Sequence, residues 1–301
     1  MSEVIVPAKL DFMIIGAMKS GTTSLAFYLN QSSQIYIPKE KELPFFLGNS
    51  TSSKHFDNFY KEYFSKANSS QIVGTSTPQY MMHPNVFKKI HKAKPNIKLI
   101  AILRDPIERL VSHYNHSCRL GVENRELKEI VIDQLASNFH DELSDDTTQK
   151  YISSGEYGYI FEEVLKHFKK EQILLIKFES FKNNTQHILN EISNFLGIGQ
   201  FDHNKQFKIY MKGGKEKLIN IDHDKLINKA ADYLSQKGLK KFVPNSLKKK
   251  ILLLGSTLDR VNVKKNSKDS TNLLDKKLLQ KIHEHYEKDQ KKFESLNLEV
   301  L

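Results

Sequence analysis

The sequence predicts an α/β domain in which helices flank a central parallel sheet, and two observations lead to that prediction. Short apolar runs that suit buried strands alternate with segments that carry apolar residues at helical spacing. The first apolar run also stops at a glycine loop that leads straight into a helical segment. Alternating strands and helices are typical of a parallel sheet, which binds ligands at the carboxyl ends of its strands.

Four apolar runs supply the expected strands. The run "FMIIG" at 12–16 ends at a glycine, as in a buried strand that enters a tight turn. A second buried run, "IKLIAILRDP", covers 97–106. The other two are "QILLIKFE" at 172–179 and the shorter "QIVGTST" at 71–77.

Helices are expected between these strands. The segment 22–29 has Leu25, Tyr28 and Leu29 at helical spacing. A second helix is expected to begin at Asp105-Pro106, because aspartate is a good N-cap and proline suits the first helical position. Its apolar face consists of Ile107, Leu110, Val111 and Tyr114. Further helices are expected near 156–169 and 184–196.

The rest of the chain is expected to extend this core of residues 10–200. Residues 119–150 are polar and irregular in pattern, which suggests an insertion on the substrate side. From about 216 to 301 the chain has a lysine-rich helical pattern that closes with an amphipathic stretch at 272–296. Since no Gly/Ser/Pro linker marks a boundary, we expect a single domain over 1–301.

The composition favours an anionic partner. The 301 residues are 39% hydrophobic and 27% charged, as in soluble globular proteins, and the formal net charge is +11. A basic balance suits a nucleotide, an acidic glycan, a nucleic acid or a membrane surface. We do not expect nucleic-acid binding, because the chain has no zinc-ligand spacing and no run of five basic residues.

The sequence also predicts a cytoplasmic location. A single cysteine, Cys118, forms no internal disulfide and suits a reducing compartment. No signal peptide is expected, since the first residues do not pair a basic start with a long apolar stretch. No apolar run approaches the roughly 20 residues that cross a bilayer, so no integral membrane segment is expected.

The loop "IIGAMKSGTTSL" at 14–25 predicts an anion site. Gly16 and Gly21 have the spacing of a Walker loop, but Thr22 stands where its lysine belongs and Lys19 lies inside the loop. Backbone N–H groups at a helix N-terminus bind anions, and Lys19 adds a positive charge. The hydroxyl donors are Ser20, Thr22 and Thr23. The alternative is an ordinary glycine turn after a strand.

A second anion contact is expected where the 97–106 strand ends. Arg104 ends this strand, and Ser112 follows eight residues later, two turns into the next helix. Together they could clamp a phosphate through charge-assisted hydrogen bonds. The alternative is that Arg104 pairs with Asp105 or Glu108. With the glycine loop, this arrangement indicates a ligand with two separate anionic groups.

These two motifs resemble those of sulfotransferases that use 3′-phosphoadenosine 5′-phosphosulfate (PAPS). "MKSGTTSL" resembles their 5′-phosphosulfate loop and "LRDPIERLVSHY" their 3′-phosphate motif. The resemblance covers about 10–200 and implies a P-loop-like fold related to nucleotide kinases, with PAP as product and no metal. It implies that Lys19 contacts the bridging oxygen of the phosphosulfate and that Arg104 and Ser112 bind the 3′-phosphate. The residues implied to hold the 5′-phosphate are Ser20, Gly21, Thr22, Thr23 and Ser24.

The resemblance also suggests two candidates for the catalytic base. "PKEKELPFF" at 38–46 is similar to a "KE-x-x-FF" segment of the glycan-type and bacterial branch, where the glutamate is the base. The matching residue is Glu42, with Glu40 nearby. The alternative is His83, which precedes Arg104 by 21 positions, as the histidine base does in small-molecule sulfotransferases, but which also suits the start of a helix.

Other segments match the family less closely. "GTSTPQY" at 74–80 resembles a "GE-[KS]-[ST]-P-x-Y" segment, but Thr75 and Ser76 stand where glutamate and often lysine occur. Tyr157, in "SGEYGYI", is expected to face the cofactor or the acceptor, or to be a core residue. His113 and His116 are interpreted as surface or wall residues. A late loop that closes over the cofactor's 3′ side is matched by Lys212, Gly213 and Gly214, although its flanking arginine is missing and the alternative is an ordinary turn.

The sequence thus predicts a PAPS-dependent sulfotransferase of the bacterial, glycan-sulfotransferase-like type. We expect a hydroxyl acceptor, rather than an amine, on a carbohydrate or glycolipid, with peripheral contact to a lipid-linked acceptor as one option. The acceptor pocket is expected in the variable loops at 45–70 and 119–153. The alternatives are a P-loop nucleotide or sugar kinase, against which the misplaced lysine counts, and a non-catalytic nucleotide- or polyanion-binding protein.

Overall fold

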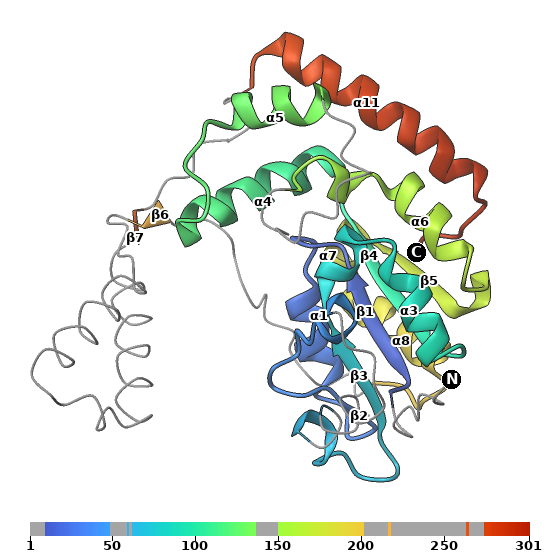
Figure 1. Cartoon of the computed structure of the whole chain (residues 1–301). Coiled ribbons are helices and arrows are strands. Elements are labelled where there is room, and N and C mark those ends of the chain that lie inside the picture. Colours follow the sequence, from blue (N-terminus) through green and yellow to red (C-terminus); the bar gives the residue numbers. More distant parts are fainter. Residues whose placement is uncertain are drawn as a thin grey trace, which may run out of the picture.

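A computed structural model describes residues 10–48, 59, 62–136, 150–201, 216–217, 263–264 and 274–301. Its centre is a five-stranded sheet in the order β2-β3-β1-β4-β5, with every neighbouring pair parallel (Figure 1). The strands are β1 (Phe12–Gly16), β2 (Ile35–Tyr36), β3 (Ile72–Ser76), β4 (Lys98–Leu103) and β5 (Ile173–Lys177). The α/β class and the four predicted strands are confirmed, and β2 is an additional short edge strand.

The strands are apolar throughout because helices cover both faces of the sheet. All five residues of β1 are buried, and alternate ones enter different cores. Met13 and Ile15 pack on the face that carries α3 (Val86–Ala93) and α6 (Tyr157–Leu165). Phe12 and Ile14 pack on the opposite face, with α1 (Thr22–Leu29) and α8 (Thr185–Leu196). Burying each such aliphatic side chain stabilises the fold by about 1.5–3 kcal/mol.

Helix α4 (Pro106–Leu120) begins as its sequence predicts. The Asp105 carboxylate accepts hydrogen bonds from the N–H groups of Ile107 (3.0 Å) and Glu108 (2.8 Å), so it is the N-cap. The predicted apolar face is also confirmed. Ile107, Leu110 and Val111 belong to a third core, and Tyr114 packs against it.

Two predictions of secondary structure are wrong. Residues 119–150 are not uniformly irregular, because α5 (Leu127–Ala136) lies within them and buries Leu127, Ile130 and Val131 in the third core. The strand expected over 172–179 ends at Lys177, where α7 (Phe178–Asn183) begins. Short 3₁₀ helices cover Phe45–Leu47 (η1), Pro78–Met82 (η2), Ser153–Gly155 (η4) and Lys170–Gln172 (η5).

The described part of the C-terminal region is mainly α11 (Lys276–Ser295), which agrees with the amphipathic stretch predicted at 272–296. The expectation of helix from about 216 is wrong for residues 216–217 and 263–264. These residues form two short strands, β6 (Glu216–Lys217) and β7 (Val263–Lys264), which pair antiparallel. Nearer the end of the chain, Val300 pairs parallel with Leu175, which covers the outer edge of β5. The single-domain arrangement stays a prediction.

Helix α11 lies alongside α6 and caps it (Figure 1). The Asp289 carboxylate accepts hydrogen bonds from the N–H groups of Gly158 (2.8 Å) and Tyr159 (2.9 Å), although 131 positions separate it from Gly158. A side chain at position 158 could not fit, since its Cβ would lie 2.3 Å from the Asp289 carbonyl oxygen. The glycine therefore permits the close approach of the two helices.

Candidate functional site

The glycine loop, defined as residues 16–22, joins the carboxyl end of β1 to α1. Two of its residues, Lys19 (φ 71°) and Gly21 (φ 88°), have left-handed backbone conformations. Glycine adopts this conformation readily, whereas a lysine adopts it at a cost, which is a feature of many functional loops. The Phe178 and Phe181 rings of α7 support the loop from one side, 3.4 Å from where a Cβ on Gly21 would lie. The fold thus holds the loop in a fixed, tightly turned shape.

The loop places several hydrogen-bond donors at one helix end. The first turn of α1 has no acidic residue and no side-chain cap, so no side chain of this helix competes for its leading N–H groups. Within the loop, Ser20 is fully buried and lies beside the Tyr157 hydroxyl. Thr22 is buried, whereas Thr23 and Ser24 are half-buried. This arrangement suits an anion at the start of α1.

Lys19 has an unusual electrostatic environment. Burial, together with the nearby cations Arg119 and Arg104, lowers the pKa of its ammonium group to about 8, and the Glu42 carboxylate opposes that shift. A bound anion would favour the protonated form again. Lys19 therefore combines a half-buried positive charge with a proton that neutral solution only moderately favours.

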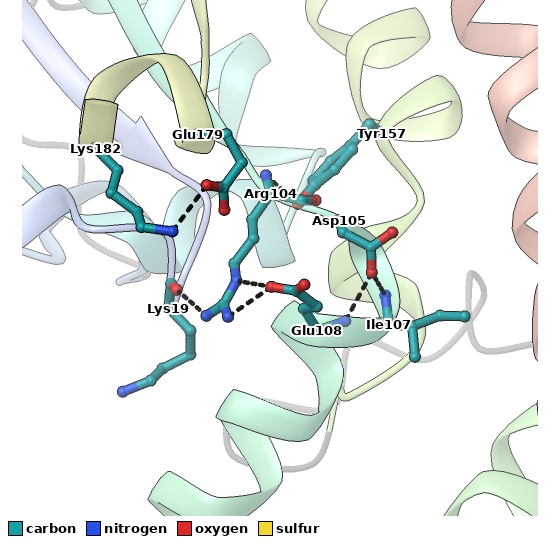
Figure 2. Close-up of polar contacts among 8 residues, drawn as sticks. All are labelled: Lys19, Arg104, Asp105, Ile107, Glu108, Tyr157, Glu179 and Lys182. Carbon is teal, nitrogen blue, oxygen red and sulfur yellow. Dashed lines mark hydrogen bonds and ion pairs between the residues drawn. The ribbon is translucent and has the colours of Figure 1, made fainter. Parts of the chain in front are cut away.

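Arg104 follows β4 and has several partners (Figure 2). Its Nη2 and Nε atoms donate to Glu108 Oε2 at 2.8 and 3.2 Å, and its Nη1 donates to the Lys19 carbonyl oxygen at 3.3 Å. Its guanidinium also lies over the Phe178 ring, 4.9 Å from the centroid. We call the Arg104–Glu108 pair the arginine clamp. Of the two acidic partners considered from the sequence, Glu108 makes this pair and Asp105 caps α4.

Tyr157 fixes the backbone of the clamp. Its hydroxyl accepts a hydrogen bond from Arg104 N–H (3.3 Å) and donates one to the Arg104 carbonyl oxygen (3.0 Å). Burial raises the pKa of this phenol, so it stays protonated. Tyr157 thus braces Arg104 from the buried side. Ser112 is half-buried on α4, two turns beyond the start of that helix.

Glu42 is held at the same edge of the sheet by both carboxylate oxygens. Lys41 Nζ donates to Oε1 at 2.5 Å, and Gln79 Nε2 donates to Oε2 at 3.0 Å. Burial raises the pKa of Glu42, but the hydrogen bonds from Lys41 and Gln79 outweigh burial and lower it overall. Glu42 is therefore a carboxylate at neutral pH, and it acts electrostatically on Lys19.

The segment that follows β3 fixes the loop that carries Glu42. Ser76 N–H donates to the Lys41 carbonyl oxygen (2.9 Å), and Leu43 N–H donates to Thr77 Oγ1 (3.0 Å). The buried Tyr80 hydroxyl donates to the Leu43 carbonyl oxygen at 2.7 Å. The "GTSTPQY" segment thus has a visible structural role. The Thr75 and Ser76 hydroxyls are buried and make no hydrogen bond within the described residues.

We did not predict from the sequence that two residues of α4, His116 and Arg119, would lie near Lys19. His116 and Arg119 lie on α4, and the pKa of His116 falls to about 4 because of burial, Lys19 and Arg119. The signal was present, since positions 112, 116 and 119 follow the i, i+4, i+7 spacing of one helix face. Of the two interpretations of His113, surface or wall, the surface one is wrong: its side chain is fully buried, and burial lowers its pKa well below the usual range.

Residues 9–294 match the family described as the sulfotransferase domain. The chain belongs to this family. Membership confirms the resemblance seen in the two phosphate motifs and favours the sulfotransferase interpretation over the kinase and non-catalytic alternatives. A solved structure titled as a sulfotransferase from Alicyclobacillus acidocaldarius has the same fold, with a TM-score of 0.55 and 24% identity, covering 80% of this chain and 99% of that one.

Curated relatives include proteins named as sulfotransferases in eukaryotes. The membrane-associated sulfotransferase kil1 of Dictyostelium discoideum is 37% identical over 120 residues, which cover 38% of this chain and 24% of the relative. A bifunctional heparan sulfate N-deacetylase/N-sulfotransferase of Caenorhabditis elegans is 24% identical over 251 residues, 80% of this chain and 28% of the relative. The chain thus spans about a quarter of the length of these two relatives, and the bacterial type stays a prediction.

The remaining sequence candidates have different outcomes. His83 lies at the end of η2, where Lys150 Nζ approaches its Nδ1 at 3.5 Å, and its role as a base stays an alternative. The predicted closing loop at 212–214 lies outside the described residues. Within the described ranges, no group of three metal-ligating side chains comes together. No helix there is both long and apolar enough to cross a membrane.

Proposed function

We propose that this family member transfers the sulfuryl group of PAPS to a hydroxyl of a carbohydrate or glycolipid acceptor. The observation that carries this proposal is the meeting of three charged residues beside the carboxyl ends of β1, β3 and β4. The three residues are Lys19 on the glycine loop, Arg104 in the clamp, and Glu42. Arg104 donates a hydrogen bond to the Lys19 carbonyl oxygen, and both Arg104 and Glu42 act on the pKa of Lys19. This set combines anion binding with a proton acceptor.

The residues present fit PAPS, because they form two separate groups of anion donors. The N–H groups of the glycine loop and of the first turn of α1, with the Ser20, Thr22, Thr23 and Ser24 hydroxyls, would hold the 5′-phosphate. Arg104 and Ser112 would hold the 3′-phosphate. Tyr157 would act through Arg104 by fixing its backbone. Lys212, Gly213 and Gly214 are kept as proposed contacts on the 3′ side.

The chemistry divides between two residues. When bound, PAPS supplies the sulfuryl group and leaves as PAP. Glu42 would take the proton of the attacking hydroxyl, and its lowered pKa keeps it ionised and ready to accept. Lys19 would neutralise the charge that develops on the departing 5′-phosphate oxygen. The acceptor oxygen would form the new S–O bond as the bond from sulfur to the 5′-phosphate oxygen breaks. The acceptor's proton would then be on Glu42, and the negative charge left on the 5′-phosphate would lie beside Lys19.

The proposed acceptor class draws support from the relatives and from local charge. Several matched relatives are named for heparan sulfate, including a human heparan sulfate glucosamine 3-O-sulfotransferase 3B1 that is 23% identical. Lys41 and His116 lie near the proposed base, and Arg119 lies near Lys19 and His116. We propose an O-linked transfer first and an N-linked transfer second. A cytoplasmic location and peripheral contact with a lipid-linked acceptor also remain proposals.

The test is a mass-spectrometric search for the gain of one sulfate across a carbohydrate panel incubated with the protein and PAPS. Glu42→Gln keeps the size of the side chain but removes its basicity, so turnover should fall by roughly 10²–10⁴. PAP binding should be unchanged, because neither phosphate contact involves Glu42. His83→Asn serves as the control and should cost much less. An active Glu42→Gln variant beside an inactive His83→Asn variant would reassign the base to His83.

A further inference from the structure

The two hydrogen bonds to Glu42 come from different parts of the chain. Lys41 is its immediate neighbour, on the same loop, and its ion pair with Glu42 moves with that loop. Gln79 lies 37 positions away, on η2, directly after β3. The main chain of that loop is hydrogen-bonded to Ser76 and Thr77, and the Gln79 contact ties the Glu42 carboxylate itself to η2.

The Gln79 side chain has a defined orientation on a rigid support. A carboxylate only accepts hydrogen bonds, so the amide nitrogen of Gln79 must face Glu42 and its carbonyl oxygen must point away. The flanking residues Pro78 and Tyr80 are buried, and Tyr80 is bonded to the Leu43 carbonyl oxygen. The amide is thus carried by a short helix that the core immobilises.

Fold stability alone does not favour glutamine at this position. Gln79 Oε1 is buried and makes no hydrogen bond within the described residues. A buried polar atom without a partner costs free energy, and an apolar side chain would avoid that cost. The compensating contact is the one to Glu42, which points to a role at the carboxylate.

The charge of the donor also matters. Glu42 faces Lys41 from its own loop, Lys19 from the glycine loop and His116 from α4. Another cation would hold the carboxylate more strongly but would lower its proton affinity further. A neutral amide fixes the second oxygen with a smaller loss of basicity. Each carboxylate oxygen still has one lone-pair direction available for the acceptor's proton.

We infer that Gln79 is a positioning residue that fixes the Glu42 carboxylate for proton transfer from the acceptor hydroxyl. The inference rests on the proposed function, with Glu42 as the base. It adds a residue from the variable position of the "TPQY" segment to the catalytic apparatus. Gln79 touches the base and acts on the reaction only through it.

The first test measures the pKa of Glu42 directly and needs no turnover. The protein is labelled with ¹³C at the glutamate carboxyl carbons, bound to PAP and titrated by NMR, and Glu42→Gln identifies the resonance. Gln79→Leu removes the donor and should raise the pKa of Glu42. Gln79→Glu adds a like charge and should raise it further, whereas Gln79→Lys should lower it. An unchanged pKa across the three variants would overturn the inference.

The matched control is Gln280→Leu. Gln280 Nε2 donates to Glu284 Oε1 at 3.0 Å on the exposed surface of α11, so the same chemical pair is broken far along the chain from Glu42. This variant should leave the Glu42 resonance and turnover as in the wild type. The melting shift caused by PAP verifies that each variant is folded, and the Lys and Glu replacements keep the series informative if Gln79→Leu does not fold.

The second test is kinetic. Gln79→Leu should lower kcat about tenfold with little change in KM for PAPS, since a misdirected catalytic group slows the chemical step. The acid limb of its pH profile should move to higher pH. An unchanged kcat and pH profile, with Glu42→Gln inactive, would overturn the inference and leave the proposed function intact. Absence of transfer by the wild type, with the NMR shifts as expected, would instead overturn the proposed function.

Discussion

The glycine loop presents main-chain N–H groups, whereas the arginine clamp beside it depends on a single side chain. Folding fixes the loop, because Gly21 can adopt its left-handed conformation and α7 supports it. The clamp already has a partner, since Arg104 donates twice to Glu108. In the proposed function, a phosphate would meet the leading N–H groups of α1 with no side-chain cap to displace, but at the clamp it would share Arg104 with Glu108. Folding thus forms the glycine loop in advance, whereas at the clamp Glu108 would compete with the phosphate for Arg104.

Of the loop and the clamp, the loop should show the larger effect. Lys19→Ala should reduce turnover by roughly 10²–10³, the usual cost of removing one donor that stabilises charge in the transition state. PAP binding should fall much less, because the main-chain donors remain. The control is Lys182→Ala, which removes an exposed lysine whose recorded partner is Glu179 (Figure 2). A Lys19→Ala variant with wild-type turnover would remove the lysine from the chemical step.

The clamp should have the next largest effect, and only on ligands that carry a 3′-phosphate. Arg104→Ala should weaken PAP by about 10- to 100-fold, as expected for loss of a charge-assisted contact. Adenosine 5′-phosphosulfate, which lacks the 3′-phosphate, should lose little affinity. Isothermal titration with both ligands makes the comparison. Equal losses would mean that Arg104 supports the loop through its bond to the Lys19 carbonyl oxygen.

The pH dependence separates the charge of Lys19 from the main-chain donors. Since the pKa of Lys19 is about 8 in the unliganded protein, Lys19 is almost fully protonated below pH 7 and its contribution to PAP affinity should be nearly constant there. Between pH 7 and 9 the affinity should fall about tenfold if the protonated form dominates binding. Lys19→Arg keeps its charge throughout this range and should abolish the dependence. A wild-type affinity that is flat to pH 9 would mean that the loop binds without the lysine's charge.

The same pKa has an opposite effect on folding. In the unfolded chain Lys19 would titrate near the usual 10.5, so the unfolded state binds more protons between about pH 8 and that value. The contribution of Lys19 to the free energy of unfolding should therefore rise with pH between about 8 and 10.5, whereas the affinity for PAP falls as Lys19 loses its proton. Urea titrations of the wild type and Lys19→Arg, without ligand, measure the difference.

The smallest effect is a gain of affinity. Glu108→Gln removes the competitor in the clamp and should tighten PAP by up to about fivefold, because half-exposed ion pairs contribute only 0–1 kcal/mol. Glu179→Gln, which makes the same charge change on the neighbouring α7, is the control. Weaker binding by Glu108→Gln would show that Glu108 orients Arg104 and does not compete with the phosphate.

The sequence predicted the loop well, because its elements depend on local rules. The strand at 12–16 and the helix at 22–29 have the predicted bounds, and the Asp105 cap is confirmed. A short apolar run before a glycine and a cap before a proline are each decided within a few residues. The glycine loop belongs to this local class.

The rest of the candidate site depends on packing between distant segments. Gln79 reaches Glu42 only because η2 follows β3, which lies next to β1, and no local pattern indicates this contact. Histidine is a polar residue type, which suggests a place on the surface. The position of His113 on α4 nevertheless buries it beside Tyr151. We did not predict helix α5 from the sequence, because its apolar side chains become buried only when α4 and α11 pack against it.

The capping of α6 by Asp289 sets an order of events during synthesis. Tyr157, which braces Arg104, is the first residue of α6, and the next two N–H groups are capped by a residue about 130 positions further along the chain. At 5–20 residues per second, a ribosome needs about 7–26 s to make that length. Until Asp289 emerges and docks, these N–H groups face water. A nascent chain can therefore form its glycine loop early, but the arginine clamp reaches its final support only after residue 289 has been made.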